Sequence, residues 1–301
     1  MRWWIRGLSA TLMVLLAGSA AAQTVLAPTE RLTFDRPESW ALQYFTSASM
    51  LSGLGPDTSE ARGGIRLEIE SGWVPPLSAA QQQVGFAGTA AEDLNKAPLL
   101  LRPRVRIGVT ERLTLIAGGV PPVHAFGVTP KLIDLGAEWT MIDGAHWRAA
   151  LRAHGQTGTV TGAFTCPAGV VSAAPGSAGN PTGCQTTSDD AATLRYGAVE
   201  FAIARRLAGT AVTPHASIAL NAIDSHFQVD AHTFGRIDET ALFTHGFTGS
   251  ASAGASVPIG SRFVIVADMF YSPLMVQRTT TAPSALDGFL NVRALVSYRL
   301  R

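Results

Sequence analysis

Arginine and glutamate residues at every second position are the side chains of this sequence best suited to chemistry. Arg102, Arg104 and Arg106 follow one another at this spacing, and Glu68 and Glu70 repeat it earlier in the chain. Side chains at alternate positions of a strand lie on one face, so each group forms a row of like charge. Two such rows on neighbouring strands can pair as buried salt bridges. Around a pore they can instead form a charged constriction that selects solutes.

The same spacing places further charged residues on the face that carries these two rows. The complete set is Arg66, Glu68, Glu70, Arg102, Arg104, Arg106, Glu138, Arg148, Arg152, Glu200, Asp268 and Arg293. Within it, Glu138 stands close to Arg148 and Arg152 across a predicted turn. We favour a structural ion-pair network over a solute filter, because buried charges demand partners and a narrow interior has little room for anything else.

Catalytic motifs are weaker in this sequence than the charged rows. There is no H-E-x-x-H pair, no Walker loop, no dinucleotide fingerprint and no nucleophile elbow. His154 and His215 fall on the charged face, and four further histidines lie in or near long connections: His124, His226, His232 and His245. The alternative function is therefore a lipid or peptide hydrolase with its site at the outer rim. We expect no enzymatic activity, no metal and no cofactor.

Cysteine occurs only twice, at Cys166 and Cys184, in a stretch rich in glycine, proline, serine and asparagine. A disulfide between them would pin a long surface loop in an oxidising compartment. The chain-entropy model assigns about 3 kcal/mol to a loop of this size. Two free thiols are the alternative, and a metal site is disfavoured because no histidine lies within ten residues of either cysteine.

The elements that would position these residues alternate at period two, which is typical of β-strands. In residues 64–73, for example, Ile65, Leu67 and Ile69 alternate with charged residues, and ten such segments follow one another up to residue 300. A soluble sandwich would bury the apolar face in a core, whereas a membrane barrel turns it to lipid. The sequence has no apolar run of 18 residues after residue 22, so spanning helices are excluded and a closed barrel remains.

The connections between these segments alternate in length. Short ones fall near residues 110–112, 143–146, 206–211 and 258–261. Long ones fall near residues 74–98, 121–131, 158–192, 223–240 and 272–287. Short turns on one side and long loops on the other are typical of outer-membrane barrels, whose short turns are periplasmic. A soluble sandwich has no reason to separate its loops in this way.

Residues 23–61 precede the first clear strand and form a separate N-terminal segment. The stretch at residues 37–53 begins with proline and glutamate and ends with glycine, which fits the start and stop of a helix. As a helix in the lumen, it leaves a barrel of ten strands over residues 62–301. As a strand, it needs a partner from residues 25–35, and the barrel has twelve strands. We favour ten strands with an N-terminal helix.

The first 22 residues have the layout of a secretory signal peptide rather than of a membrane anchor. Arg2 and Arg6 precede a short apolar run at residues 8–17, and small residues up to Ala22 form a cleavage site. Only 15% of the residues are charged and the net charge is +1, so nothing attracts the chain to nucleic acid. We therefore expect export, cleavage near Ala22 and no nucleic-acid partner.

By these patterns the chain resembles bacterial outer-membrane β-barrel proteins. Its C-terminus resembles the signal that the barrel-assembly machinery reads, with Arg293, Tyr298 and Leu300 in matching places. Leu295 departs from the usual glycine, and Arg301 follows where an aromatic residue usually ends the chain. The resemblance implies an all-β, closed antiparallel barrel in the outer membrane of a Gram-negative bacterium. Its partners would be outer-membrane lipid and the assembly machinery.

The predicted strand number limits the function. A barrel of ten to twelve strands has a narrow lumen, which argues against a general diffusion porin of about 16 strands. We expect a narrow channel or binder for a small solute, or a membrane scaffold.

Overall fold

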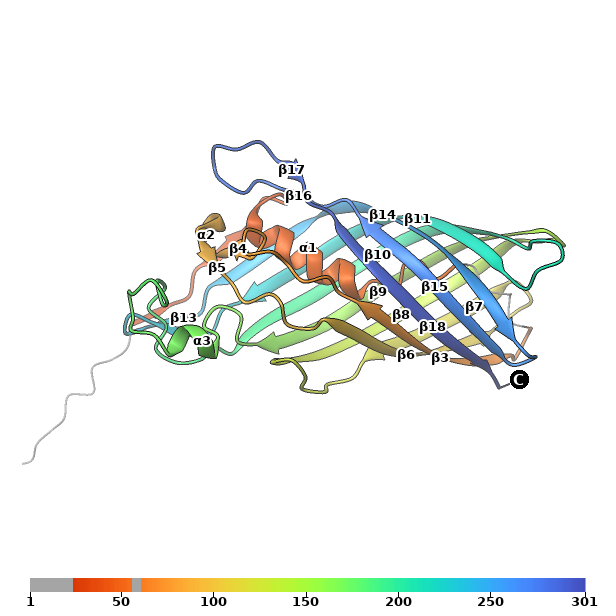
Figure 1. The fold of residues 1–301 in the computed structure, drawn as a ribbon, viewed down its shortest axis with the longest axis horizontal. Helices are drawn as coiled ribbons and strands as arrows, with labels where there is room; N and C mark the ends of the chain where they lie inside the picture. The colour runs from red at the N-terminus through yellow and green to blue at the C-terminus, as the bar shows by residue number, and fades with distance from the viewer. Residues whose placement is uncertain (1–23, 56–60, 301) are drawn as a thin grey trace, which may run out of the picture.

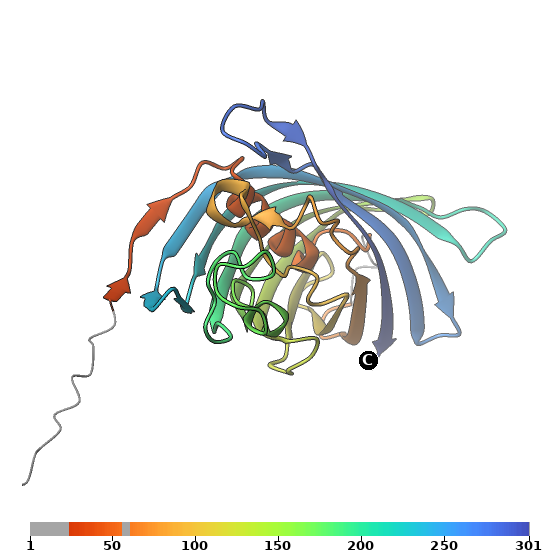
Figure 2. The ribbon, with the colours of Figure 1, turned by 60° about the vertical axis from the view of Figure 1, so that its left-hand side comes forward.

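Ten antiparallel strands form a closed barrel in the computed structural model, which describes residues 24–55 and 61–300 (Figures 1 and 2). The predicted signal peptide lies outside the described residues. The barrel strands are β3 (Ile65–Trp73), β6 (Leu99–Gly108), β7 (Leu113–Val120), β8 (Val128–Asp143), β9 (Trp147–Gly162), β10 (Asp190–Arg205), β11 (Thr213–Gln228), β14 (Ala241–Ile259), β15 (Phe263–Ser272) and β18 (Phe289–Arg299). Each pairs with the next along the chain, and β18 pairs with β3 to close the ring. The prediction of ten strands is confirmed, and the alternative of twelve is wrong.

The barrel wall has two unequal sides. The strands β8, β9, β10, β11 and β14 have 16 to 19 residues each, whereas the other five have 8 to 11. Short connections such as residues 109–112 and 260–262 lie at one end, here called the turn end, where the C-terminus also lies (Figure 1). The long connections lie at the opposite, loop end. The separation of short and long connections therefore follows the sequence expectation.

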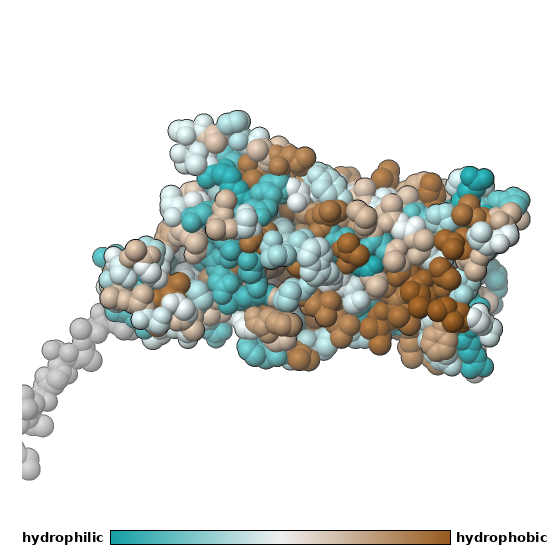
Figure 3. Space-filling view, in the orientation of Figure 1, coloured by the Kyte–Doolittle hydropathy of each residue, from teal (hydrophilic) through white to brown (hydrophobic). Residues whose placement is uncertain are grey.

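Apolar side chains cover the outside of the strands. Ile69, Leu135 and Ile218 point outward and are 57–65% exposed, and many other alternate positions resemble them. Figure 3 shows hydrophobic residues gathered over the strands, with hydrophilic residues towards both ends. A closed antiparallel barrel with an apolar outer belt is the architecture of an outer-membrane protein. No helix within residues 24–55 and 61–300 has the length and hydropathy to cross a membrane.

The N-terminal segment enters the barrel from the loop end. There β1 (Thr24–Leu26) pairs with β13 (Arg236–Asp238), which also pairs with β12 (Ala231–Thr233). The strand β2 (Thr29–Arg31) then runs parallel to the start of β14.

Helix α1 (Pro37–Ser49) follows and lies inside the ring of strands (Figure 2). Trp40 and Tyr44 on this helix are buried against strand residues such as Phe289. The prediction of a helix within residues 37–53 is confirmed.

Several small elements cover the loop end. They are β4 (Gln83–Val84), α2 (Gly85–Gly88), β5 (Ala90–Ala91), α3 (Ala168–Val171), β16 (Met275–Val276) and β17 (Ala285–Leu286). The predicted disulfide between Cys166 and Cys184 is present, and it packs against Val229 and Ala231. The loop is therefore held in place by a disulfide and by a small apolar core.

Candidate functional site

The charged residues expected on the lumen face are all buried inside the barrel, each 9% exposed or less. Between β3 and β6, Glu68 lies 2.8 Å from Arg104, and Glu70 lies 3.0 Å from the same guanidinium group and 3.3 Å from Arg102. The strand register explains the pairing, because Glu68 is directly opposite Arg104 and Glu70 is opposite Arg102. The two rows seen in the sequence therefore interlock as ion pairs.

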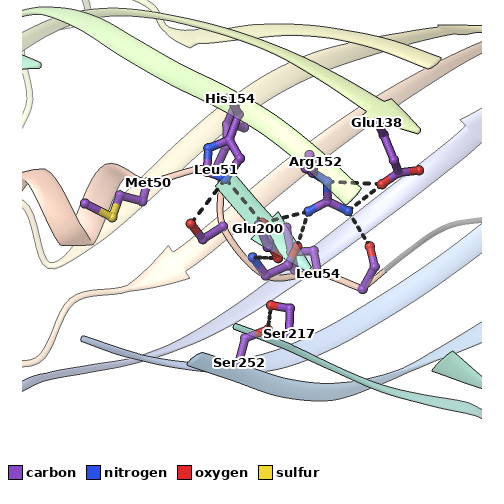
Figure 4. Close-up of polar contacts among 12 residues, drawn as sticks. Met50, Leu51, Leu54, Glu138, Arg152, His154, Glu200, Ser217 and Ser252 are labelled. Atoms are coloured by element: carbon purple, nitrogen blue, oxygen red, sulfur yellow. Dashed lines mark hydrogen bonds and ion pairs between the residues drawn. The ribbon is translucent and has the colours of Figure 1, made fainter. Parts of the chain in front are cut away.

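A second group of charges lies on the neighbouring strands β8, β9 and β10 (Figure 4). The guanidinium group of Arg152 lies 2.6 Å from Glu138 and 3.3 Å from Glu200. Glu138 also lies 2.7 Å from Arg106, which belongs to the first group. A single ion-pair network therefore connects β3, β6, β8, β9 and β10.

Arg148 pairs with an acidic residue at the turn between β8 and β9. The register of the hairpin places Arg148 opposite Asp143, and the two side chains lie 2.9 Å apart. Glu138 pairs with Arg106 and Arg152 instead, and Arg148 stands on the same face of β9 as Arg152, within the expected distance along the strand.

The chain that follows α1 acts as a plug of the lumen, here defined as residues 50–55. Arg293 donates hydrogen bonds to the carbonyl oxygens of Met50 and Ser52 at 2.7 and 2.9 Å. Arg152 donates to the carbonyl oxygens of Gly53 and Gly55 at 2.9 and 2.7 Å. The barrel arginines therefore bind the plug through its backbone.

The barrel carboxylates bind the same plug through its N–H groups. The N–H of Gly53 donates to Glu200 at 3.0 Å, and the N–H of Leu54 donates to Asp268. Since buried backbone groups need partners, these contacts satisfy the plug and the charged wall together. The predicted lumen-lining residues Arg152, Glu200, Asp268 and Arg293 thus face packed protein at this depth.

Two members of this network were missed by the sequence reasoning. Asp134 of β8 lies 3.0 Å from Arg102, and it stands four residues before Glu138 on the same face, so the alternation could have identified it. Tyr196 accepts a hydrogen bond from the N–H of Leu51 at 2.7 Å. No sequence signal indicates that contact, because it depends on where the plug lies.

The buried histidine of the network has an arrangement unlike a hydrolase relay. The Nε2 atom of His154 lies 3.2 Å from Glu200 and 3.4 Å from the hydroxyl of Ser52, while its Nδ1 atom lies 3.1 Å from Tyr196. In a Ser-His-Asp relay the serine and the carboxylate contact opposite nitrogens. Here both contact the same nitrogen, so His154 cannot pass a proton from Ser52 while Glu200 orients it.

Two cavities lie above the plug, towards the loop end. The mouth cavity has a volume of about 460 Å³, and its lining includes Leu42 and Phe45 of α1 and the charged residues Glu30, Arg36 and Asp238. Both the position and the lining of this cavity differ from those of the charged network below it.

The second, side cavity has a volume of about 390 Å³ and lies between α1 and the wall from β3 to β10. Its lining is mainly apolar and includes Val120, Leu132, Val160 and Leu194. Asn95 and Lys96 are among its few polar lining residues. The sequence alone does not indicate that these residues form a site, because their arrangement depends on how α1 packs in the lumen.

A carboxyl group beside the mouth cavity has an altered affinity for protons. Glu92 lies in the connection between β3 and β6 and lines this cavity. Burial raises the pKa of Glu92 well above its usual value, and the nearby carboxylates of Asp190 and Glu38 raise it further. Among the described residues, no group of three or more histidine, cysteine or acidic side chains could hold a metal ion.

The residues of the predicted assembly signal lie on the last strand and just beyond it. Arg293 faces the lumen and is 1% exposed, whereas Leu300 follows β18 and is 49% exposed. Tyr298 is partly exposed and stacks near Phe263. Recognition of these residues by the assembly machinery stays a prediction.

Comparison with known proteins finds solved structures of β-barrel proteins that resemble this chain. No family model and no curated protein matches the chain. Among solved structures, the outer membrane protease OmpT from Escherichia coli matches at 7% identity and a TM-score of 0.39, covering 79% of this chain and 94% of that chain. The translocator domain of the autotransporter NalP from Neisseria meningitidis matches at 10% identity and a TM-score of 0.40, covering 81% and 91%. The toluene transporter TodX from Pseudomonas putida matches at 11% identity and a TM-score of 0.30, covering 92% and 98%.

Proposed function

We propose that this outer-membrane barrel binds a small apolar molecule in the side cavity. The observation that carries the proposal is an apolar cavity of about 390 Å³ between α1 and the barrel wall. This volume lies within the usual range of ligand pockets, which are lined mainly by apolar side chains with few polar groups. Asn95, whose amide hydrogen-bonds the backbone of Leu77, and Lys96, which pairs with Asp93, are polar lining residues of this kind.

The closed lumen supports a binder over a channel that runs through the barrel. The plug is held by Arg152, Glu200, Asp268 and Arg293, all at most 3% exposed. Because opening this path would separate buried charges from their partners, it would cost several kcal/mol. The nitrogen arrangement of His154 likewise favours binding over hydrolysis.

A matched pair of substitutions tests the proposal. Leu132 lines the side cavity and is 3% exposed, whereas its neighbour Ile133 points outward and is 58% exposed. We expect Leu132→Trp to fill the cavity and weaken binding of the apolar fluorophore N-phenyl-1-naphthylamine at least about tenfold, or about 1.4 kcal/mol. Ile133→Trp should leave the affinity unchanged. Saturation fluorescence of the protein in lipid nanodiscs measures both, and equal affinities would contradict the proposal.

Conductance in planar bilayers tests the closed lumen independently. The refolded mature protein should give no discrete, ion-selective openings, because the plug and the ion-pair network occupy the lumen. A heat-modifiability gel provides the folding control. Openings that Arg104→Ala or Arg152→Ala alters would favour the solute filter instead.

A further inference from the structure

The barrel wall is incomplete between β6 and β7. Their pairing runs only from Arg104 and Gly118 to Gly108 and Thr114. On the loop side of this point, β6 continues to Leu99 while it pairs with β3 on its other edge. Residues 99–103 therefore have no ladder partner on the β7 side, although β7 pairs with β8 as far as Val120. We call this interruption the lateral gap.

The sequence explains why the strands separate there. Pro103 is the first residue of β6 beyond the ladder with β7, and proline has no N–H to donate. Pro121 and Pro122 directly follow β7, so the opposite strand cannot extend the ladder either. The gap is thus a consequence of residue types on both strands.

The side cavity reaches this gap. Its lining includes Trp73, Leu99 and Leu101, which point away from the lumen and are 51–53% exposed. It also includes Leu132 and Leu194, which point into the lumen and are 3% and 2% exposed. The cavity is therefore lined by residues from both faces of the wall beside the lateral gap, and its outer end adjoins apolar residues of the outer face.

The other end of the side cavity adjoins the mouth cavity. Both are lined by Phe45, Leu94, Phe164 and Ala192, and the rings of Phe45 and Phe164 lie 6.1 Å apart between centroids. Towards the turn end, the ion pair of Arg102 with Asp134 is fully buried below the cavities. These two cavities therefore extend sideways, on the loop side of this ion pair.

We infer that the lateral gap is a portal through which a small apolar molecule exchanges between the side cavity and the outer leaflet of the membrane. This inference rests on the proposed function, because it requires the side cavity to hold such a molecule. The mouth cavity supplies the aqueous end of the same route. An apolar solute thereby bypasses the charged lumen without crossing it.

Stopped-flow exchange of N-phenyl-1-naphthylamine in lipid nanodiscs tests the portal. Leu101→Trp places a bulky ring at the gap, and Leu135→Trp places the same ring on the lipid face of β8, where Leu135 is 64% exposed. We expect Leu101→Trp to lower both the association rate and the dissociation rate by at least about tenfold. The Leu135→Trp variant should exchange the fluorophore at the same rates as the unaltered protein.

A second variant closes the gap by another route. Pro103→Val combined with Pro121→Thr restores two N–H donors, so β6 and β7 can pair further and exchange should again slow. Normal exchange in both folded variants would overturn the portal while leaving binding intact. An unaltered protein without saturable binding would instead contradict the proposed function. Heat-modifiability gels establish folding, and slow exchange in either folded variant with normal exchange in Leu135→Trp supports the portal.

Discussion

The two halves of the lumen differ in chemistry although the same strands build both. On β8, Glu138 and Asp134 face inward nearer the turn end, whereas Leu132 and Val128 face inward nearer the loop end. The turn-end half is filled by ion pairs and the plug, and the loop-end half holds α1 and two cavities. One face of a strand can therefore contribute to the buried charged network along part of its length and line an apolar cavity along the rest.

The difference between the two halves follows from what burial requires of charged and of apolar side chains. Buried charges require partners at close range, so the turn-end half leaves little empty volume. Apolar side chains impose no such requirement, and an apolar cavity can stay empty and accept an apolar ligand. The comparison predicts that substitutions in the turn-end half affect stability most, and those in the loop-end half affect binding most.

The largest effect is expected from Arg152→Ala in the turn-end half. The substitution leaves Glu138 and Glu200 buried without this cation, so the free energy of unfolding should fall by about 3–5 kcal/mol. Arg112→Ala, at an exposed turn, should change it by less than about 0.5 kcal/mol. Urea unfolding followed by tryptophan fluorescence measures both. Similar decreases in the free energy of unfolding for the two variants would show that the buried ion pairs of the turn-end half do not stabilise the fold.

The disulfide should have the next largest effect. Replacing Cys166 and Cys184 together by serine should lower the free energy of unfolding by about 3 kcal/mol. It should also weaken binding of the apolar fluorophore, because Phe164 lines both cavities two residues before Cys166. Unfolding and fluorescence titrations under oxidising conditions provide the measurements. A destabilised variant that binds normally would show that the loop does not position Phe164.

Phe45→Ala should have a smaller effect on stability and a larger one on selectivity. The ring is half-buried between the two cavities, so its loss should cost about 1–3 kcal/mol, less than for a fully buried phenylalanine. The joined cavities should then bind larger apolar probes than the unaltered protein does. Phe247→Ala on the lipid face, where Phe247 is 64% exposed, is the matched control. Unchanged size selectivity would indicate that the cavities are already continuous.

The smallest effect concerns the pH dependence of the loop end. The pKa of Glu92 is raised in the folded protein by burial and by Asp190 and Glu38, so the folded state holds the proton more tightly than the unfolded state. Its contribution to stability is therefore full below the unfolded pKa of about 4.3 and is lost as pH rises through the folded value. Glu92→Gln should remove this loss of stability with rising pH. Unfolding curves measured from pH 4 upward that keep the same pH slope in the variant would contradict this assignment.

The strands and the charged rows could be predicted from the sequence because both follow from period-two alternation. That alternation placed Glu68 opposite a row that contains Arg104, and the register then fixed the pairing. The segment at residues 247–257 gave a weaker signal because small residues dominate it, yet it belongs to β14, the longest strand. Alternation identifies faces reliably only where the two faces differ in polarity.

The plug and the cavities could not be predicted in this way. Arg152 and Arg293 bind carbonyl oxygens of the plug. Because every residue carries a carbonyl oxygen, no residue type at residues 50–55 indicates the contact. The cavities depend on the space that α1 leaves against β8 and β10, which is a property of packing and not of spacing. Pro103 and Pro121 were visible as ladder breakers in principle, but their alignment across a strand pair required the register.

Anomalous diffraction from crystals soaked with bromobenzene tests most directly that the two halves differ in function. We expect a bromine peak in the side cavity, next to Leu132 and Leu194, and none among the charged residues below the plug. The Leu132→Trp variant should lose the peak. A bromine peak within the charged network, or none in the side cavity at full soak, would contradict this difference between the two halves.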